Sequence, residues 1–263
     1  MILRRLSENL RVQNWTAITI ELFIVVIGVF IGTQVSNLNQ GRLEKRATAK
    51  MLEQLAPELR SQLEFFDGVG TYFGTTRRFA DEALRGWEGD PGVSDERFVI
   101  AAYQASQITG IAINPDSWSL TFGGSQLRNI DDPKIRRNLE LTLTADYEPV
   151  EFTAVATRYR EQVRHVIPIQ IQDRIREDCG DRNVKGKEGA LIVVLPRSCP
   201  LRINPADAHA IAAALRARTD LPSELHWHLA AVATFMANVE TLAMPMRELE
   251  RQLAVSSTAR KGS

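Results

Sequence analysis

The stretch AITIELFIVVIGVFIGTQV, from Ala17 to Val35, decides the architecture that the sequence predicts, and Glu21 is its only charged residue. About 19 residues at 1.5 Å per residue make a helix of about 28 Å, which matches the hydrocarbon core of a bilayer. Trp15 stands just before this stretch, where an aromatic side chain is typical of the membrane–water interface. We therefore predict a single N-terminal transmembrane helix over 15–36.

A cleavable signal peptide is the rival interpretation, because Arg4, Arg5 and Arg11 form a basic segment before the apolar run. Such a peptide has a shorter apolar core, which is followed by a cleavage site made of small residues. The sequence GTQVSN at 32–37 contains no such site. The sequence therefore favours an uncleaved signal anchor, preceded by a short cytoplasmic tail over 1–14.

Two indicators of the orientation of this anchor conflict. Three basic residues precede the span and four follow it closely: Arg42, Lys45, Arg46 and Lys50. Taken literally, this count leans slightly toward a cytoplasmic domain. Cys179 and Cys199 lean the other way, because an even pair of cysteines in an extracytoplasmic domain is typical of a disulfide. Two unpaired buried thiols are the alternative. We expect a disulfide, with most of the chain in the periplasm.

Composition indicates a folded domain and gives no sign of a nucleic-acid partner. The chain has 263 residues, of which 44% are hydrophobic and 24% are charged, as in ordinary globular proteins. A chain of this length can bury a sizeable core. Acidic and basic residues balance at 32 each, so no overall charge favours nucleic acid.

Helical spacing of apolar residues continues after the span. The expected core positions of a helical stalk over 37–66 are Leu52, Leu55, Leu59, Leu63 and Phe66. We expect the transmembrane helix to continue into this stalk, with a kink or a second helix start at Pro57.

Later helix starts are indicated by capping residues. Ser94, Asp132 and Asn204 stand at expected N-caps, the last two followed by proline, and Asp220 precedes the last long helix. A helix over 150–178 is expected to bend at Pro168. Together these signals predict an all-α fold.

The expected domain layout completes this prediction. A helical bundle fills 67–255, with a small β-hairpin insert at 179–199, where the run ALIVVL at 190–195 supplies one strand. The residues at 256–263 are expected to form a disordered tail.

The stretch from Glu21 to Gly32, followed by QVSNLN at 34–39, resembles a family of bacterial single-span membrane proteins of unknown function. A second region at 117–137 is similar to the turn and helix of that family. The chain departs from the family at Leu38, where tryptophan is usual, and in its cysteine-bracketed insert. The resemblance implies a helical domain anchored in a bacterial inner membrane, and it implies no catalytic residues.

Three sets of residues are candidates for contacts at the membrane. Glu21 inside the span either reaches back to the near interface or faces another membrane helix. Gly28 and Gly32 form a G-x-x-x-G step that favours close helix–helix packing, although glycine is common in spans. The four basic residues after the span are either ligands of anionic lipid headgroups or an ordinary solvated face.

No pattern points to catalysis, a cofactor or a metal. His226 and His228 are two positions apart and point to different faces of a helix, so we expect core or surface histidines there. The sequence FGGS at 122–125 is expected to be a turn, because no phosphate-loop lysine follows it. Nucleophile-elbow, H-E-x-x-H and C-x-x-C motifs are absent.

The leading functional hypothesis is a membrane-anchored interaction or sensing module outside the cytoplasm. A structural or assembly subunit, dimerising or docking through its transmembrane helix, is the alternative. An enzyme is a third possibility that the missing motifs argue against. The expected partners are membrane lipid and a second copy or another membrane protein.

Overall fold

The structure is a computed structural model that describes residues 15–111 and 125–261. The tail expected over 1–14 and three residues of the turn expected at 122–125 lie outside this part of the chain. The elements in chain order are α2 (Trp15–Glu88), α3 (Asp95–Gln104), α5 (Ser125–Arg128), α6 (Pro133–Leu143), the short 3-10 turns η1 (Glu148–Val150) and η2 (Phe152–Val155), α7 (Arg158–Val166), α8 (Ile169–Cys179), β1 (Arg182–Lys185), β2 (Leu191–Val194), α9 (Pro205–Ala217) and α10 (Leu221–Lys261). The protein is therefore a helical bundle with one small β-hairpin, as the sequence predicts.

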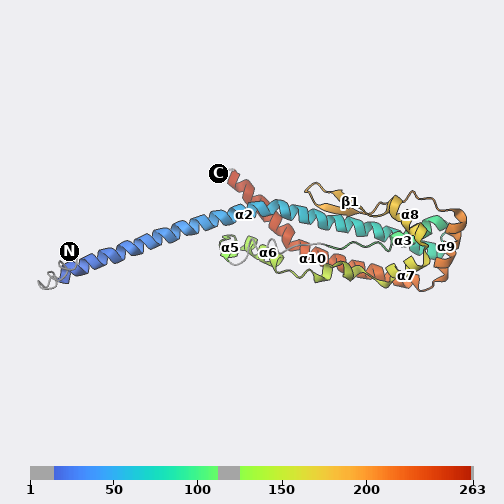
Figure 1. Cartoon of the computed structure of the whole chain (residues 1–263), viewed down its shortest axis with the longest axis horizontal. Helices are drawn as coiled ribbons and strands as arrows, with labels where there is room; N and C mark the ends of the chain where they lie inside the picture. The colour runs from blue at the N-terminus through green and yellow to red at the C-terminus, as the bar shows by residue number, and fades with distance from the viewer. Residues whose placement is uncertain (1–14, 112–124, 262–263) are drawn as a thin grey trace.

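Helix α2 is a single helix of 74 residues that extends far beyond the bundle (Figure 1). Pro57 lies inside it without ending it, because Leu55 and Leu59 on either side are buried and held by packing. A proline interrupts only one hydrogen bond of the ladder, which packing on both sides compensates. The expected boundary at Phe66 between a stalk and a bundle is wrong, since the same helix continues to Glu88.

The two halves of α2 have opposite environments. Large apolar side chains are exposed in the first half, from Trp15 to Leu43. Thr48 is the first buried residue along this helix among those whose side chains are described. Beyond it, the expected core positions from Leu52 to Phe66 are all buried at helical spacing, which confirms the predicted pattern.

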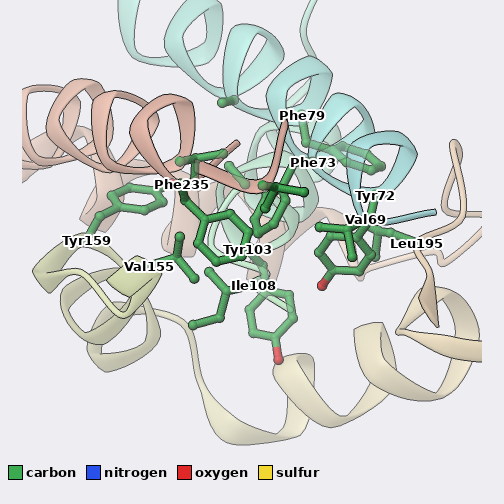
Figure 2. Close-up of a cluster of buried hydrophobic side chains, with 14 of the residues drawn as sticks. Val69, Tyr72, Phe73, Phe79, Tyr103, Ile108, Val155, Tyr159, Leu195 and Phe235 are labelled. Carbon is green, nitrogen blue, oxygen red and sulfur yellow. The ribbon is translucent and has the colours of Figure 1, made fainter. Parts of the chain in front are cut away.

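Helix α10 runs back along the second half of α2 and completes the long axis of the bundle (Figure 1). The rings of Phe73 and Phe235 join the two helices, with centroids 5.4 Å apart. Figure 2 shows these rings among buried aromatic residues that include Tyr103 and Tyr159. The hydroxyl of Tyr159 donates to the carbonyl of Ala102 at 2.8 Å, so its polar atom is satisfied inside the core.

The predicted helix starts are confirmed by hydrogen bonds at each cap. The Ser94 hydroxyl accepts from the backbone of Arg97, and the Asn204 side chain accepts from Ala206. The Asp132 carboxylate accepts from Lys134 at 2.8 Å and opens α6 with a proline at its first turn. These caps depend only on neighbouring residues, which is why the sequence reveals them.

The helix expected over 150–178 is wrong in its first part. Two 3-10 turns occupy 148–155, and α7 begins only at Arg158. The bend expected at Pro168 is instead a break between two helices, because α7 ends at Val166 and α8 begins at Ile169. Ile167 has an extended backbone, as a residue before proline prefers.

The β-hairpin lies against α2, inside the cysteine loop where it is expected. Its strands pair antiparallel, with Arg182 opposite Val194, and its turn contains Gly189 at φ +93°. The Glu64 carboxylate of α2 accepts the backbone N–H groups of Lys187 at 2.5 Å and Glu188 at 2.8 Å. The turn is thus fastened to α2 by a charge-assisted contact.

The disordered tail expected over 256–263 is wrong for the residues described there. Helix α10 continues to Lys261, and the Ser256 hydroxyl donates to the carbonyl of Gln252 at 2.9 Å. The segment from Gln252 to Lys261 contains no glycine or proline that would end the helix. Burial of Leu249 and Leu253 against the bundle stabilises this last part of α10.

Candidate functional site

The exposed part of α2 is long and apolar enough to cross a membrane. No residue of its most apolar window is buried within the protein. The segment Leu221–Ser256 of α10 also meets the criterion of length and composition. Phe235 and Val239 of this segment are buried in the bundle core, whereas Trp227 and Met244 are exposed, and 28% of its most apolar window is buried.

The three residues predicted to contact other membrane helices all lie on this exposed part of α2. Glu21 is exposed, and so are Gly28 and Gly32. A methyl group built on either glycine would meet nothing within 4 Å. Their helix face is therefore open to close approach by another helix.

The four basic residues after the apolar segment are exposed, but one of them has a partner. Lys45 donates to the Asp131 carboxylate at 2.7 Å, which joins α2 to the linker between α5 and α6. The side chains of Arg42, Arg46 and Lys50 are exposed in the same part of the helix. The contact of Lys45 was not expected from the sequence, because Asp131 lies 86 residues away.

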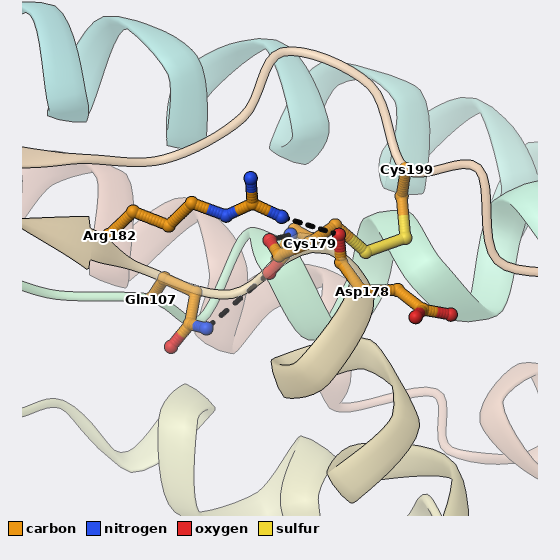
Figure 3. The surroundings of a disulfide bond; sticks show 6 residues. Gln107, Asp178, Cys179, Arg182 and Cys199 are labelled. Atoms are coloured by element: carbon orange, nitrogen blue, oxygen red, sulfur yellow. Dashed lines mark hydrogen bonds between the residues drawn. A yellow bond between two sulfur atoms is a disulfide. The ribbon is translucent and has the colours of Figure 1, made fainter.

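The predicted cysteine pair is present as a disulfide. Cys179 ends α8 and Cys199 follows β2, with their Cα atoms 5.2 Å apart (Figure 3). The buried Gln104 side chain donates to the carbonyl of Cys179 at 2.7 Å. Arg182 donates to the carbonyl of Asp178 at 3.1 Å. The disulfide thus closes the base of the hairpin onto α3 and α8.

A cluster of polar side chains surrounds this base, and we call it the polar centre. Its members come from α2, α3, α7, α8 and the segments that follow them: Tyr72, Tyr103, Gln104, Ser106, Gln107, Arg160, Arg164, Arg176 and Asp181.

Hydrogen bonds connect most of the polar centre, and Tyr72 and Asp181 are joined to each other. Arg160 donates to the carbonyl of Ser106 at 2.7 Å, and Arg164 donates to Gln107 at 2.9 Å. The Arg164 guanidinium also stacks over the Tyr103 ring, 4.6 Å from its centroid. These contacts fix α7 against the end of α3.

Burial shifts several pKa values in the polar centre. Loss of solvent lowers the pKa of Arg164, and the nearby charges of Arg160 and Arg176 lower it further. Burial raises the pKa of Asp181, although the Tyr72 hydroxyl donates to its carboxylate at 3.0 Å. Burial likewise raises the pKa of Tyr72, so this phenol stays protonated at neutral pH.

The polar centre was not predicted from the sequence. Its residues are distributed from Tyr72 to Asp181, and each looks like an ordinary surface or core residue by itself. Arg160 and Arg164 share one helix face at a spacing of four residues, which is the only local signal. Chemically, the centre presents the guanidinium donors of three arginines beside one carboxylate, that of Asp181, which accepts from the Tyr72 hydroxyl.

Two of the histidines make structural contacts. A hydrogen bond of 2.7 Å joins the Thr157 hydroxyl to Nδ1 of the buried His228, and so links α7 to α10. His209 contacts the Asp95 carboxylate at 2.8 Å on the surface. Across residues 15–111 and 125–261, no three His, Cys, Asp or Glu side chains group in a way that could hold a metal ion.

Searches against protein-family models, curated proteins and solved structures found no match to this chain.

Proposed function

We propose that this chain is a membrane-anchored interaction or sensing module. Helix α2 acts as its signal anchor, and the helical domain lies outside the cytoplasm. In a bacterium, this places the anchor in the inner membrane and the domain in the periplasm.

The observation that carries the proposal is the exposed apolar part of α2. Between Ile20 and Val35, nearly every large apolar side chain is exposed, and none packs on the bundle. Each such side chain forgoes about 1.5–3 kcal/mol of hydrophobic burial while it stays in water. A bilayer removes this segment from water, and its length of about 28 Å fits the hydrocarbon core.

The same helix supplies a physical connection between membrane and domain. At 1.5 Å per residue, α2 is about 110 Å long, and it carries Tyr72 of the polar centre. A ligand or protein that shifts the distal bundle therefore acts on the same continuous helix that enters the membrane. Signalling by this route requires a partner inside the membrane or the cytoplasm.

The disulfide supports the proposed orientation. Structural disulfides persist in oxidising compartments such as the periplasm and are rare in the cytoplasm. The pair Cys179 and Cys199 closes a loop with a sequence separation of 20. The exposed Arg42, Arg46 and Lys50 then lie near the outer leaflet, where anionic headgroups would contribute about 1 kcal/mol for each residue.

A reporter that is active only in the periplasm tests both the anchor and its orientation. Fused after Ser263, it is expected to be active, and both cysteines are expected to resist thiol labelling until a reductant is added. Replacing Val26 and Val29 together by arginine costs about 2.5–3.5 kcal/mol per residue at the centre of the span. We expect this variant to lose the reporter signal.

Leu38→Arg is the matched control, because it adds charge just beyond the apolar segment and should leave the signal unchanged. An active reporter in the doubly substituted protein would contradict the anchor. Free thiols together with an inactive reporter in the unaltered protein would contradict the orientation.

A structural or assembly subunit is the second candidate, and the open glycine face of α2 favours it. Lipid offers no hydrophobic drive between helices, so close backbone packing must supply the attraction. Gly28→Ile or Gly32→Ile adds bulk to that face while keeping the segment apolar. We expect either change to weaken self-association several-fold in a membrane two-hybrid assay of the full chain.

Gly41→Ile is the control for this assay, since Gly41 also has open space around it but lies beyond the apolar segment. The segment 15–46, assayed alone, shows whether contacts between bundle domains mask the effect. An unchanged signal in both Ile variants would remove self-association through these glycines from consideration.

A further inference from the structure

The end of the bundle farthest from the exposed part of α2 contains two adjoining hollows, which we call the distal groove. Their volumes are about 420 and 340 Å³, and both are lined by Phe79, Glu82 and Arg197. The larger hollow extends along the start of α3 and beside Cys199. The smaller hollow is lined additionally by Arg78 and Arg85 of α2. The groove is thus formed where α2, α3 and the disulfide-bonded segment meet.

The acidic side chains of the larger hollow already have partners inside the protein. Glu82, which also lines the smaller hollow, forms an ion pair with Arg97. The Glu96 carboxylate accepts the backbone N–H of Ile203 at 2.8 Å and contacts Arg202 at 3.4 Å. These acids therefore neutralise Arg97 and Arg202 and form no ion pair with Arg78, Arg85 or Arg197.

Asp81 is the remaining acid of the smaller hollow, and it is engaged elsewhere. Its carboxylate accepts from Arg77, four residues earlier on the same helix, at 3.0 Å. Arg77 does not line either hollow. Asp81 therefore forms its ion pair with an arginine outside the smaller hollow, and not with one of the arginines that line it.

Three arginines of the smaller hollow are held weakly. Among the residues that the structure describes, Arg78 donates only to the neutral hydroxyl of Thr75, at 3.3 Å. Arg85 lies 3.8 Å from the Asp90 carboxylate, beyond hydrogen-bond distance. Arg197 is exposed and forms no hydrogen bond or ion pair with any residue in 15–111 or 125–261.

Two segments of the chain bring these three arginines to the lining of one hollow. Arg78 and Arg85 are seven residues apart, so they share one face of α2. Arg197 approaches from the segment after β2, where the disulfide at Cys199 ties the backbone to α8 two residues further on. Phe79, whose side chain is largely buried, lines the same hollow.

We propose that the distal groove binds a small organic anion through Arg78, Arg85 and Arg197. The ligand class is a molecule that carries carboxylate or phosphate groups, because the guanidinium fork donates two parallel hydrogen bonds to either. The apolar part of such a molecule covers Phe79. This site would give the proposed sensing function its ligand class. Its biological role rests on that proposed function, whereas anion binding can be measured independently of it.

Calorimetric titration of the full chain in a neutral detergent tests this site. Citrate and inorganic phosphate are the two probes, and sodium chloride at matched ionic strength measures non-specific screening. We expect at least one probe to bind more tightly than chloride. Citrate alone identifies a carboxylate site, phosphate alone a phosphate site, and both together a general oxyanion site.

Arg197→Gln should weaken the better probe about tenfold or more, since it removes a charge-assisted contact without disturbing a contact inside the protein. Arg78→Gln combined with Arg197→Gln should abolish binding. Arg158→Gln is the matched control, because Arg158 is an exposed arginine of α7 outside the groove. Circular dichroism confirms that each variant is folded.

Three results would overturn the proposal: no probe binds more tightly than chloride, Arg197→Gln binds as the unaltered protein does, or Arg158→Gln weakens binding equally. None of these results bears on the reporter experiment. Loss of the anion site and loss of the membrane anchor are therefore distinguishable.

Discussion

Replacing Phe98 by alanine is expected to lower the free energy of unfolding by about 3–5 kcal/mol. Phe98 is fully buried where α3 meets the end of α2. Its ring packs edge-on against Trp87, with centroids 5.0 Å apart, and Arg216 stacks on it at 4.9 Å. A side chain at Gly86 would collide with this ring, so the helices approach as closely as glycine permits. Alanine at 98 leaves a cavity that neither helix can close.

Urea unfolding of the full chain in detergent, followed by circular dichroism, measures this loss. Phe98→Leu is the control, because it retains most of the buried volume and should cost clearly less. Packing of Phe98 also holds the start of α3 in place beside the distal groove. The alanine variant should therefore weaken anion binding as well. A loss below about 1 kcal/mol for Phe98→Ala would contradict the packing described for this contact.

Acid is expected to destabilise the domain by about 3 kcal/mol through His228 alone. Burial is the main cause that lowers the pKa of His228 to about 4, and the positive charge of Arg160 contributes to the same lowering. The unfolded chain binds a proton at this histidine below about pH 6.5, whereas the folded chain resists it until about pH 4. The stability that unprotonated His228 contributes to the folded state is therefore fully present above about pH 6.5, and it is lost as the pH falls to 4.

The free energy of unfolding at pH 7 and at pH 4 tests this contribution. His228→Gln should flatten the difference between the two values by about 3 kcal/mol, because no buried imidazole remains to be protonated. His226→Gln is the matched control, since that ring is exposed two residues away. An identical pH dependence in His228→Gln and the unaltered protein would exclude His228 as the titrating group.

Local features of the fold are readable in the sequence because they depend on neighbouring residues. The caps at Ser94, Asp132 and Asn204 satisfy backbone groups within three residues. Pro168 ends a helix through its own ring and the residue before it. The apolar run at 17–35 likewise predicts a segment that the bundle does not bury.

Competition between local preference and packing produced the errors. The alternative of a second helix start at Pro57 is wrong, because burial of Leu55 and Leu59 on both sides keeps α2 continuous. The polar residues at the end of the chain suggest disorder, but α10 extends into them from the buried Leu253. In both places, the free energy gained by burying apolar surface outweighs a local propensity of a few kcal/mol.

The sequence by itself determined the helical class, the exposed apolar segment, the hairpin and its disulfide. Only the tertiary structure decided the polar centre and the distal groove. Arg78 and Arg197 are far apart in the chain, and neither residue nor its neighbours carries a motif. They share a hollow because α2 continues to this end of the bundle and because β2, which packs on α2, leads the chain to Arg197. Sites of this kind arise from distant segments that packing brings together. Which of their charged groups find a partner of opposite charge is therefore decided only in the folded chain.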